Sequence, residues 1–118
     1  MPPMVLVVDD EDLICWSLQA RLQDAGFTTQ TAQTLEQTRI LLEKYDFTHL
    51  ITDLKLIGCT GFDIIDLVRV KFPDIHVVMI TAFGDEKNQA KAIEMGVELF
   101  QEKPVHVEDT IAYLRSTS

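Results

Sequence analysis

Five polar side chains that could act together stand at the ends of short apolar runs, far apart in the sequence. Asp9 and Asp10 follow one run, and Asp53, Thr81 and Lys103 stand at the ends of three others. If each run is a buried parallel strand, all five side chains emerge at the same carboxyl edge of one sheet, where open α/β folds bind their ligands. The spacing therefore predicts one crevice that holds three carboxylates, a hydroxyl and an ammonium group.

The chemistry that suits this set is phosphoryl transfer assisted by a divalent cation. Carboxylates a few ångströms apart destabilise one another's ionised form, and a hard cation with oxygen ligands relieves that repulsion. We expect Mg2+ (or Mn2+), because carboxylates suit both ions and Mg2+ keeps coordination positions for water and phosphate oxygens. Asp53 can then attack phosphorus as a carboxylate nucleophile. Lys103 and the cation would offset the charge that develops on the phosphoryl oxygens.

The elements that must position these residues follow from the hydrophobic pattern. Apolar runs alternate with stretches of helical periodicity, which is typical of βαβ units and a parallel sheet. The expected strands cover residues 4–8, 28–31, 47–52, 75–80 and 97–101, and the expected helices cover about 12–25, 34–44, 62–71, 87–95 and 107–114. The pattern predicts an α/β fold of the (βα)5 type. Residues 28–31 are polar and belong at an edge of the sheet.

Capping residues support several of these helix boundaries. Gly26 and Gly96 follow the first and fourth helices, where a left-handed C-terminal cap favours glycine. Thr34 with Gln37 three residues later is the capping-box pattern for the start of the second helix. Pro73 stops the third helix.

Composition bounds the kind of protein. A chain of 118 residues that is 47% hydrophobic can bury one core, so we expect a single domain over residues 1–118. Its net charge of -9 repels phosphate backbones, which argues against direct nucleic-acid binding by this segment. No stretch is apolar enough to span or bind a membrane, and we expect a cytoplasmic protein. Cys15 and Cys59 lack metal-ligand spacing, so free thiols are expected.

Taken in order, the motifs resemble those of the receiver domain of bacterial two-component response regulators. The resemblance covers essentially the whole chain and rests on the acidic turn Asp9-Asp10-Glu11, Asp53 with Gly61 eight residues later, Thr81 with Ala82, and Lys103-Pro104. It implies a flavodoxin-like, doubly wound parallel sheet of five strands in the order 2-1-3-4-5. The switch point of that order lies between the first and third strands, where Asp9, Asp10 and Asp53 would meet.

The resemblance also implies roles at the site. Asp53 would be the phosphoacceptor, and a phosphohistidine on a histidine kinase or a phosphotransfer protein would be the donor. Asp10, Asp53 and the backbone carbonyl of Lys55 would bind the metal directly, and Asp9 would act through water. The Lys103-Pro104 peptide bond would be cis, which an X-Pro bond can adopt at low cost, and it would turn Lys103 into the crevice.

Other roles implied by the resemblance concern readout and lifetime. Thr81, Ala82 and Phe100 would form the switch that changes a protein-interaction surface, and Lys55 and Phe83 would tune the lifetime of the phosphoryl group. The protein would be a regulatory phosphoprotein that catalyses only its own phosphorylation and dephosphorylation. The resemblance leaves open an output domain beyond residue 118 and a phosphorylation-dependent dimer.

One position departs from the family pattern. Ile57 is the fourth residue after Asp53, where receivers usually carry proline, and Gly58 follows it. We expect a looser loop here.

Three alternatives from other classes make different demands on the sequence. A phosphatase of the haloacid dehalogenase type needs a second acid two residues after its nucleophile, and that position is Lys55. A flavin or dinucleotide carrier needs a glycine-rich loop after the first strand, where this chain has Asp9, Asp10 and Glu11. A receiver that only docks partners would share every motif, and only a phosphorylation assay separates it from an active one.

Overall fold

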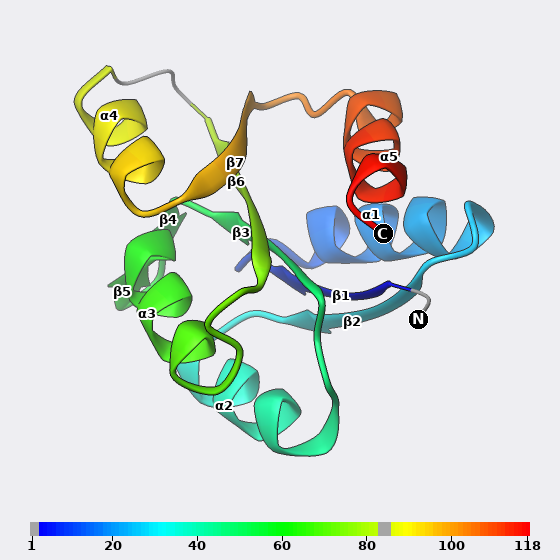
Figure 1. Cartoon of the computed structure of the whole chain (residues 1–118), viewed down its shortest axis with the longest axis horizontal. Coiled ribbons are helices and arrows are strands. Elements are labelled where there is room, and N and C mark those ends of the chain that lie inside the picture. Colours follow the sequence, from blue (N-terminus) through cyan, green and yellow to red (C-terminus); the bar gives the residue numbers. More distant parts are fainter. Residues whose placement is uncertain (1–2, 83–85) are drawn as a thin grey trace.

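The computed structural model describes residues 3–82 and 86–118, with one parallel sheet covered by helices on both faces (Figure 1). The sheet has five strands in the order β2-β1-β3-β6-β7, which is the predicted order 2-1-3-4-5. The strands are β1 (Met4–Val8), β2 (Thr28–Ala32), β3 (His49–Asp53), β6 (His76–Thr81) and β7 (Val97–Glu102). The helices are α1 (Asp12–Asp24), α2 (Leu35–Lys44), α3 (Gly61–Lys71), α4 (Glu86–Glu94) and α5 (Val107–Ser116).

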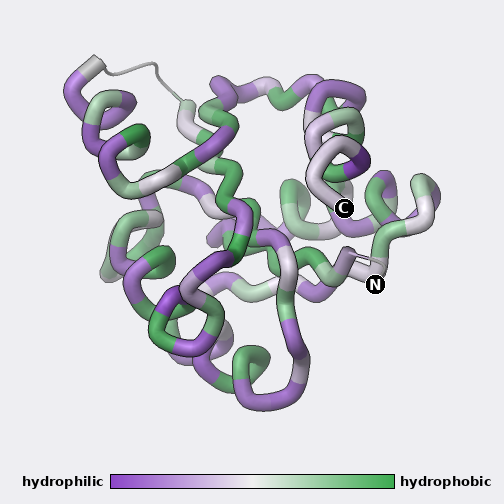
Figure 2. Tube along the Cα trace, in the orientation of Figure 1, coloured by the Kyte–Doolittle hydropathy of each residue, from purple (hydrophilic) through white to green (hydrophobic). Residues whose placement is uncertain are grey.

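Successive side chains of the central strands point to opposite faces and build two apolar clusters. Leu50 of β3 packs with α2 and α3, whereas its neighbour Ile51 packs with α1 and α5. β6 alternates in the same way through Val77 and Val78. Figure 2 shows the resulting pattern of largely apolar central strands, with apolar and polar residues alternating along the helices. The predicted doubly wound architecture is confirmed.

The predicted edge strand is also confirmed. β2 pairs only with β1 among the described strands, in parallel register from Met4 opposite Thr28 to Val8 opposite Ala32. Its position explains why a strand with polar residues is tolerated here, because an edge strand has a neighbouring strand on one side only and is less buried than a central strand.

The region expected to be a looser loop after Asp53 forms a short antiparallel hairpin instead. Its strands are β4 (Lys55–Leu56) and β5 (Cys59–Thr60), joined by Ile57 and Gly58. The turn leaves Ile57 81% exposed.

Capping residues set the starts of α3 and α2. α3 begins at Gly61 because Thr60 and Asp63 form a capping box, in which Thr60 N donates to Asp63 Oδ2 at 2.8 Å. At α2, Thr34 Oγ1 accepts from Gln37 N as predicted. The side chain of Gln37, however, accepts from the backbone of the preceding residue, Gln33, at 2.7 Å, so the box is not closed on Thr34.

Two other expectations can be compared with the described residues. Cys15 is buried, Cys59 is half-buried, and both are free thiols. Within residues 3–82 and 86–118, no helix is both long and apolar enough to cross a bilayer.

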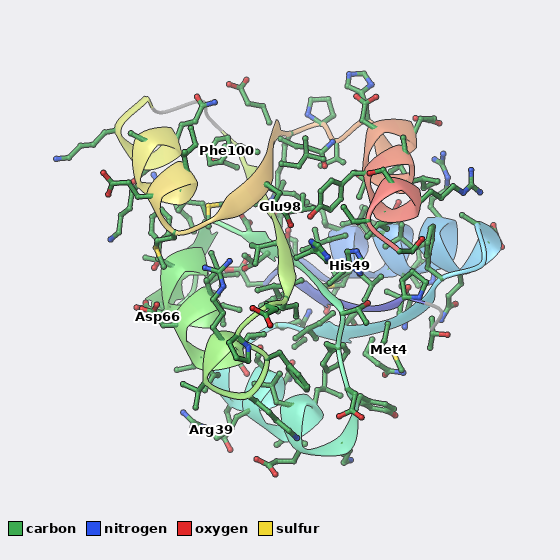
Figure 3. All side chains as sticks on the ribbon, in the orientation of Figure 1. Met4, Arg39, His49, Asp66, Glu98 and Phe100 are labelled. Atoms are coloured by element: carbon green, nitrogen blue, oxygen red, sulfur yellow. The ribbon has the colours of Figure 1, made fainter. Side chains whose placement is uncertain are left out.

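A buried histidine lies at the amino end of β3 (Figure 3). Its two ring nitrogens hydrogen-bond to Thr48 Oγ1 at 2.7 Å and Thr117 Oγ1 at 2.8 Å, and its ring stacks on His76 with centroids 5.0 Å apart. This residue, His49, is 1% exposed. Burial and the nearby charge of His76 lower its pKa from 6.5 to about 4.

The low pKa of His49 predicts a loss of stability in acid. A lowered pKa in the folded state means that the unfolded chain binds the proton more readily. The contribution of His49 is therefore complete above pH 6.5 and is lost as the pH falls toward 4. The shift corresponds to about 3 kcal/mol. Urea unfolding followed by circular dichroism should show the free energy of unfolding falling as the pH is lowered. The fall should be about 3 kcal/mol smaller in His49→Gln than in the wild type.

Exposed His106 supplies the matched control for this measurement. The His106→Gln curve should run parallel to that of the wild type across the same pH range. If His49→Gln also runs parallel to the wild type, His49 does not titrate with folding.

Candidate functional site

The five predicted residues converge at the carboxyl edge of the sheet. Asp9 and Asp10 follow β1, Asp53 ends β3, Thr81 ends β6, and Lys103 follows β7. Backbone hydrogen bonds fix the relative heights of these strand ends: Leu54 N donates to Ile80 O at 2.8 Å, and Lys103 N donates to Thr81 O at 2.7 Å.

A crevice of about 210 Å³ opens at this edge. All five predicted residues except Asp9 line it, and Asp9 lies buried beside it. Glu11 and Asn88 also line the crevice and were missed as site residues. The signal for Glu11 was the acidic run that continues past Asp10, whereas Asn88 lies in a helical stretch without a motif.

The Lys103 ammonium is the centre of the crevice. Its Nζ lies 2.9 Å from Asp53 Oδ2, 3.3 Å from Asp9 Oδ2 and 3.3 Å from Glu11 Oε1. Burial disfavours the charged ammonium, but the hydrogen bond to Asp53 and the charges of Asp9 and Asp53 outweigh it and raise the pKa of Lys103 above its usual range. Lys103 is thus held charged against the predicted nucleophile.

Asp9 is the more deeply buried of the two carboxylates that flank Lys103 inside the crevice edge, and its Oδ2 lies 3.3 Å from Lys103 Nζ. Its Oδ1 accepts a hydrogen bond from Glu11 N at 2.9 Å, whereas its buried Oδ2 has no aligned hydrogen-bond donor among the described residues. Burial raises the pKa of the Asp9 carboxyl, and the charge of Asp53 adds to the rise, against the opposing effects of the Glu11 amide and Lys103. A cation with affinity for oxygen would satisfy this buried atom.

Gly61 lets Asp53 and the start of α3 lie against each other. Its amide donates to Leu54 O at 2.7 Å. A Cβ atom at this position would lie 2.4 Å from the backbone oxygen of Asp53 and 3.0 Å from Met79 Cε. Only glycine fits this contact without moving backbone, which gives a physical reason for the spacing between Asp53 and Gly61.

The donor set at the crevice fits a divalent cation. Asp9, Asp10, Glu11 and Asp53 each offer a carboxylate oxygen, and these oxygens all lie within 4.8 Å of one another. Oxygen-only donors of this kind suit Mg2+ and Mn2+. The Lys55 amide lies 3.4 Å from Asp53 Oδ1, at the limit of a hydrogen bond. The role of the Lys55 carbonyl as a ligand stays a prediction.

A larger hollow at the opposite edge does not compete as a chemical site. It measures about 460 Å³ and is lined in part by Thr48, His49, His76 and Thr117. His49 already hydrogen-bonds to both threonines, and His76 Nδ1 lies 2.6 Å from Glu98 Oε1. These groups pair with one another, whereas the crevice gathers four carboxylates beside the Lys103 ammonium.

Comparison with known proteins identifies the family of this chain. The family described as "Response regulator receiver domain" matches residues 5–115. The chain belongs to this family. The photosynthetic apparatus regulatory protein RegA of Rhodovulum sulfidophilum is 27% identical over 97% of this chain and 62% of its own length. The response regulator protein PilR of Pseudomonas aeruginosa is 32% identical over 85% of this chain and 22% of its own length.

A solved structure is similar over nearly the whole length. The response regulator receiver domain protein from Clostridium thermocellum has a TM-score of 0.88 and 27% identity, and the match covers 98% of this chain and 93% of that one. The curated relatives are longer: this receiver domain spans 62% of RegA and 22% of PilR.

Of the predicted switch residues of the receiver domain, Thr81 and Ala82 line the crevice and Phe100 is not among its lining residues. Thr81 is buried, Ala82 is exposed, and Phe100 of β7 is half-buried opposite Met79 of β6 (Figure 3). The Lys103-Pro104 peptide bond is cis, the geometry that the resemblance implies. Phe83, predicted to tune phosphoryl lifetime, lies outside the described residues.

Proposed function

We propose that this receiver domain accepts a phosphoryl group on Asp53 in a reaction that depends on Mg2+ (or Mn2+). The single observation that carries the proposal is the Lys103 ammonium bound to Asp53 at 2.9 Å beside Asp9, whose buried oxygen lacks an aligned donor. A charged donor against a carboxylate nucleophile, next to a cluster of acidic side chains that outnumber it, suits phosphoryl transfer.

Each residue has a definite part in this reaction. An oxygen of Asp53 attacks phosphorus, and the O–P bond forms as the P–N bond of the donor phosphohistidine breaks. Lys103 shifts its hydrogen bond from Asp53 to an equatorial phosphoryl oxygen. Asp10, Asp53 and the Lys55 carbonyl would hold the cation, with Asp9 acting through water. When bound, the cation neutralises charge on the phosphoryl oxygens.

Removal of the metal tests the proposal directly. We expect the protein to gain one phosphate from acetyl phosphate with Mg2+ present, and none when a chelator replaces Mg2+. Intact-mass spectrometry and Phos-tag electrophoresis measure the product. Equal incorporation with the chelator would contradict the metal dependence, and no incorporation in either condition would mean a receiver that only docks partners.

A switch at Thr81 would carry the signal away from Asp53. The Thr81 hydroxyl can donate to an aspartyl-phosphate oxygen and draw its loop inward, and Ala82 leaves room for that movement. Phe100 would then repack and alter the surface formed by α4, β7 and α5. Phosphate can shift this equilibrium only by contacting the two states differently.

Beryllofluoride, which stands in for the phosphoryl group, allows this switch to be measured by NMR. In the wild type we expect chemical-shift changes to extend over residues 87–114. In Thr81→Ala they should stay near Asp53, and Phe100→Leu should reduce them in β7 and α5. Thr28→Ala, on exposed β2 surface, is the control and should behave as the wild type. Identical long-range changes in Thr81→Ala would mean that Thr81 does not couple the site to this surface.

The wider role follows from the same proposal. The donor would be a histidine kinase or a phosphotransfer protein, and the altered surface would act on an output domain beyond residue 118 or on a second copy in a phosphorylation-dependent dimer. Lys55 and Phe83 would set the lifetime of the phosphoryl group. The domain would work in the cytoplasm as a regulatory phosphoprotein and would turn over no external substrate.

A further inference from the structure

The three carboxylates around Lys103 differ in exposure. An ammonium has three donors, and Asp53, Asp9 and Glu11 each place an oxygen within 3.3 Å of Nζ. The side chains of Asp9 and Asp53 are 2% and 8% exposed, whereas that of Glu11 is 61% exposed. Glu11 is therefore the one partner of the three that stands at the solvent side of the crevice.

Lys103 holds the oxygens that a cation would need. Asp9, Glu11 and Asp53 all belong to the group of carboxylates within 4.8 Å of one another, and the Oδ2 atoms of the two buried ones, Asp9 and Asp53, lie against Lys103 Nζ. A divalent cation and an ammonium cannot share these oxygens at close range, because like charges repel. Lys103 must give up the two buried carboxylates and still stay near Asp53 for phosphoryl transfer.

We propose that Glu11 is a positioning residue, whose carboxylate keeps the Lys103 ammonium at the mouth of the crevice when Asp9 and Asp53 turn to a divalent cation. This inference rests on the proposed function. Glu11 already accepts a hydrogen bond from Nζ at 3.3 Å, so Lys103 can move outward without losing all of its partners. Without the charge of Glu11, Lys103 stays on the buried oxygens and competes with the cation.

Mg2+ affinity, measured apart from phosphorylation, tests this inference. Amide chemical shifts around Asp53, recorded as Mg2+ is added stepwise, give the dissociation constant. Glu11→Gln keeps the shape of the side chain and should weaken Mg2+ binding about three- to fivefold, the scale of one exposed ion pair. Glu11→Asp keeps the charge but shortens the reach to Lys103. Its Mg2+ affinity should lie between those of the wild type and Glu11→Gln.

A control variant removes the same charge elsewhere. Glu36 of α2 is exposed, its Oε2 lies 3.7 Å from Arg39 Nε, and it is not among the residues that line the crevice. Glu36→Gln should bind Mg2+ as the wild type does. An equal loss in Glu36→Gln would mean that net charge, and not Glu11, sets the affinity.

A double-mutant cycle separates an effect of Glu11 that acts through Lys103 from a direct electrostatic effect of Glu11 on the cation. In a Lys103→Gln background, Glu11→Gln should no longer weaken Mg2+ binding. The inference is overturned if Glu11→Gln binds Mg2+ as tightly as the wild type, or if the loss is the same in both backgrounds. If the wild type itself does not bind Mg2+, the proposed function fails with it.

Discussion

Replacement of Asp53 by asparagine is expected to remove phosphate incorporation entirely. The carboxamide has nearly the shape of the carboxylate but is not a nucleophile toward phosphorus. Lys103 keeps Asp9 and Glu11 as charged partners, so the site should stay assembled. Intact-mass spectrometry after treatment with acetyl phosphate and Mg2+ should show one added phosphate in the wild type and none in Asp53→Asn.

An exposed aspartate provides the matched control. Asp66 of α3 lies on the surface (Figure 3), and Asp66→Asn should be labelled like the wild type. Labelling of Asp53→Asn at the wild-type level would place the acceptor elsewhere in the chain, and peptide mapping would locate it.

Replacement of Gly61 by alanine is expected to lower the free energy of unfolding strongly. The added Cβ would lie 2.4 Å from the backbone oxygen of Asp53, a contact that flexible side chains cannot relieve. Either the start of α3 or the end of β3 must move, at a cost of about 3 kcal/mol. Chemical unfolding should show this loss, and the displaced Asp53 should accept phosphate more slowly.

Gly26→Ala separates the steric clash from the effect of losing a glycine. A Cβ at Gly26 meets no atom within 4 Å, although its φ of +96° is unfavourable for alanine. The expected cost is about 1 kcal/mol from backbone strain alone. Equal losses in both variants would mean that the contact with Asp53 O relaxes freely.

The strand ends of the site were predictable from sequence because each follows a strong apolar run. Buried β1 and β6 carry Asp9 and Thr81 to the crevice, as their patterns indicated. The hairpin formed by β4 and β5 was not predictable in this way, since two-residue strands have no periodicity. β3 begins at His49 and not at residue 47, because Phe47 packs into the core before the ladder with β1 starts.

The contacts within the site were harder to predict than its location. An acid after Asp10 looks like favourable charge at the start of a helix, so nothing in the sequence separated Glu11 from Asp12. Only the folded arrangement brings Glu11 to within 3.3 Å of Lys103, across 92 positions of the chain. Long-range pairs of this kind depend on the aim of single side chains at strand ends, which periodicity does not report.

The two apolar clusters attach two separate helical layers to opposite faces of one sheet. Leu50 and Ile51 are neighbours in the chain, yet each packs against a different set of helices. Changes in volume on one side are felt first by the helices of that side, because packed interiors transmit strain through contact. The sequence and packing of α1 and α5 can thus change while α2 and α3 keep their packing against the other face. Substitutions on the outer surface of one helical layer can therefore accumulate while the crevice at the edge of the shared sheet is kept.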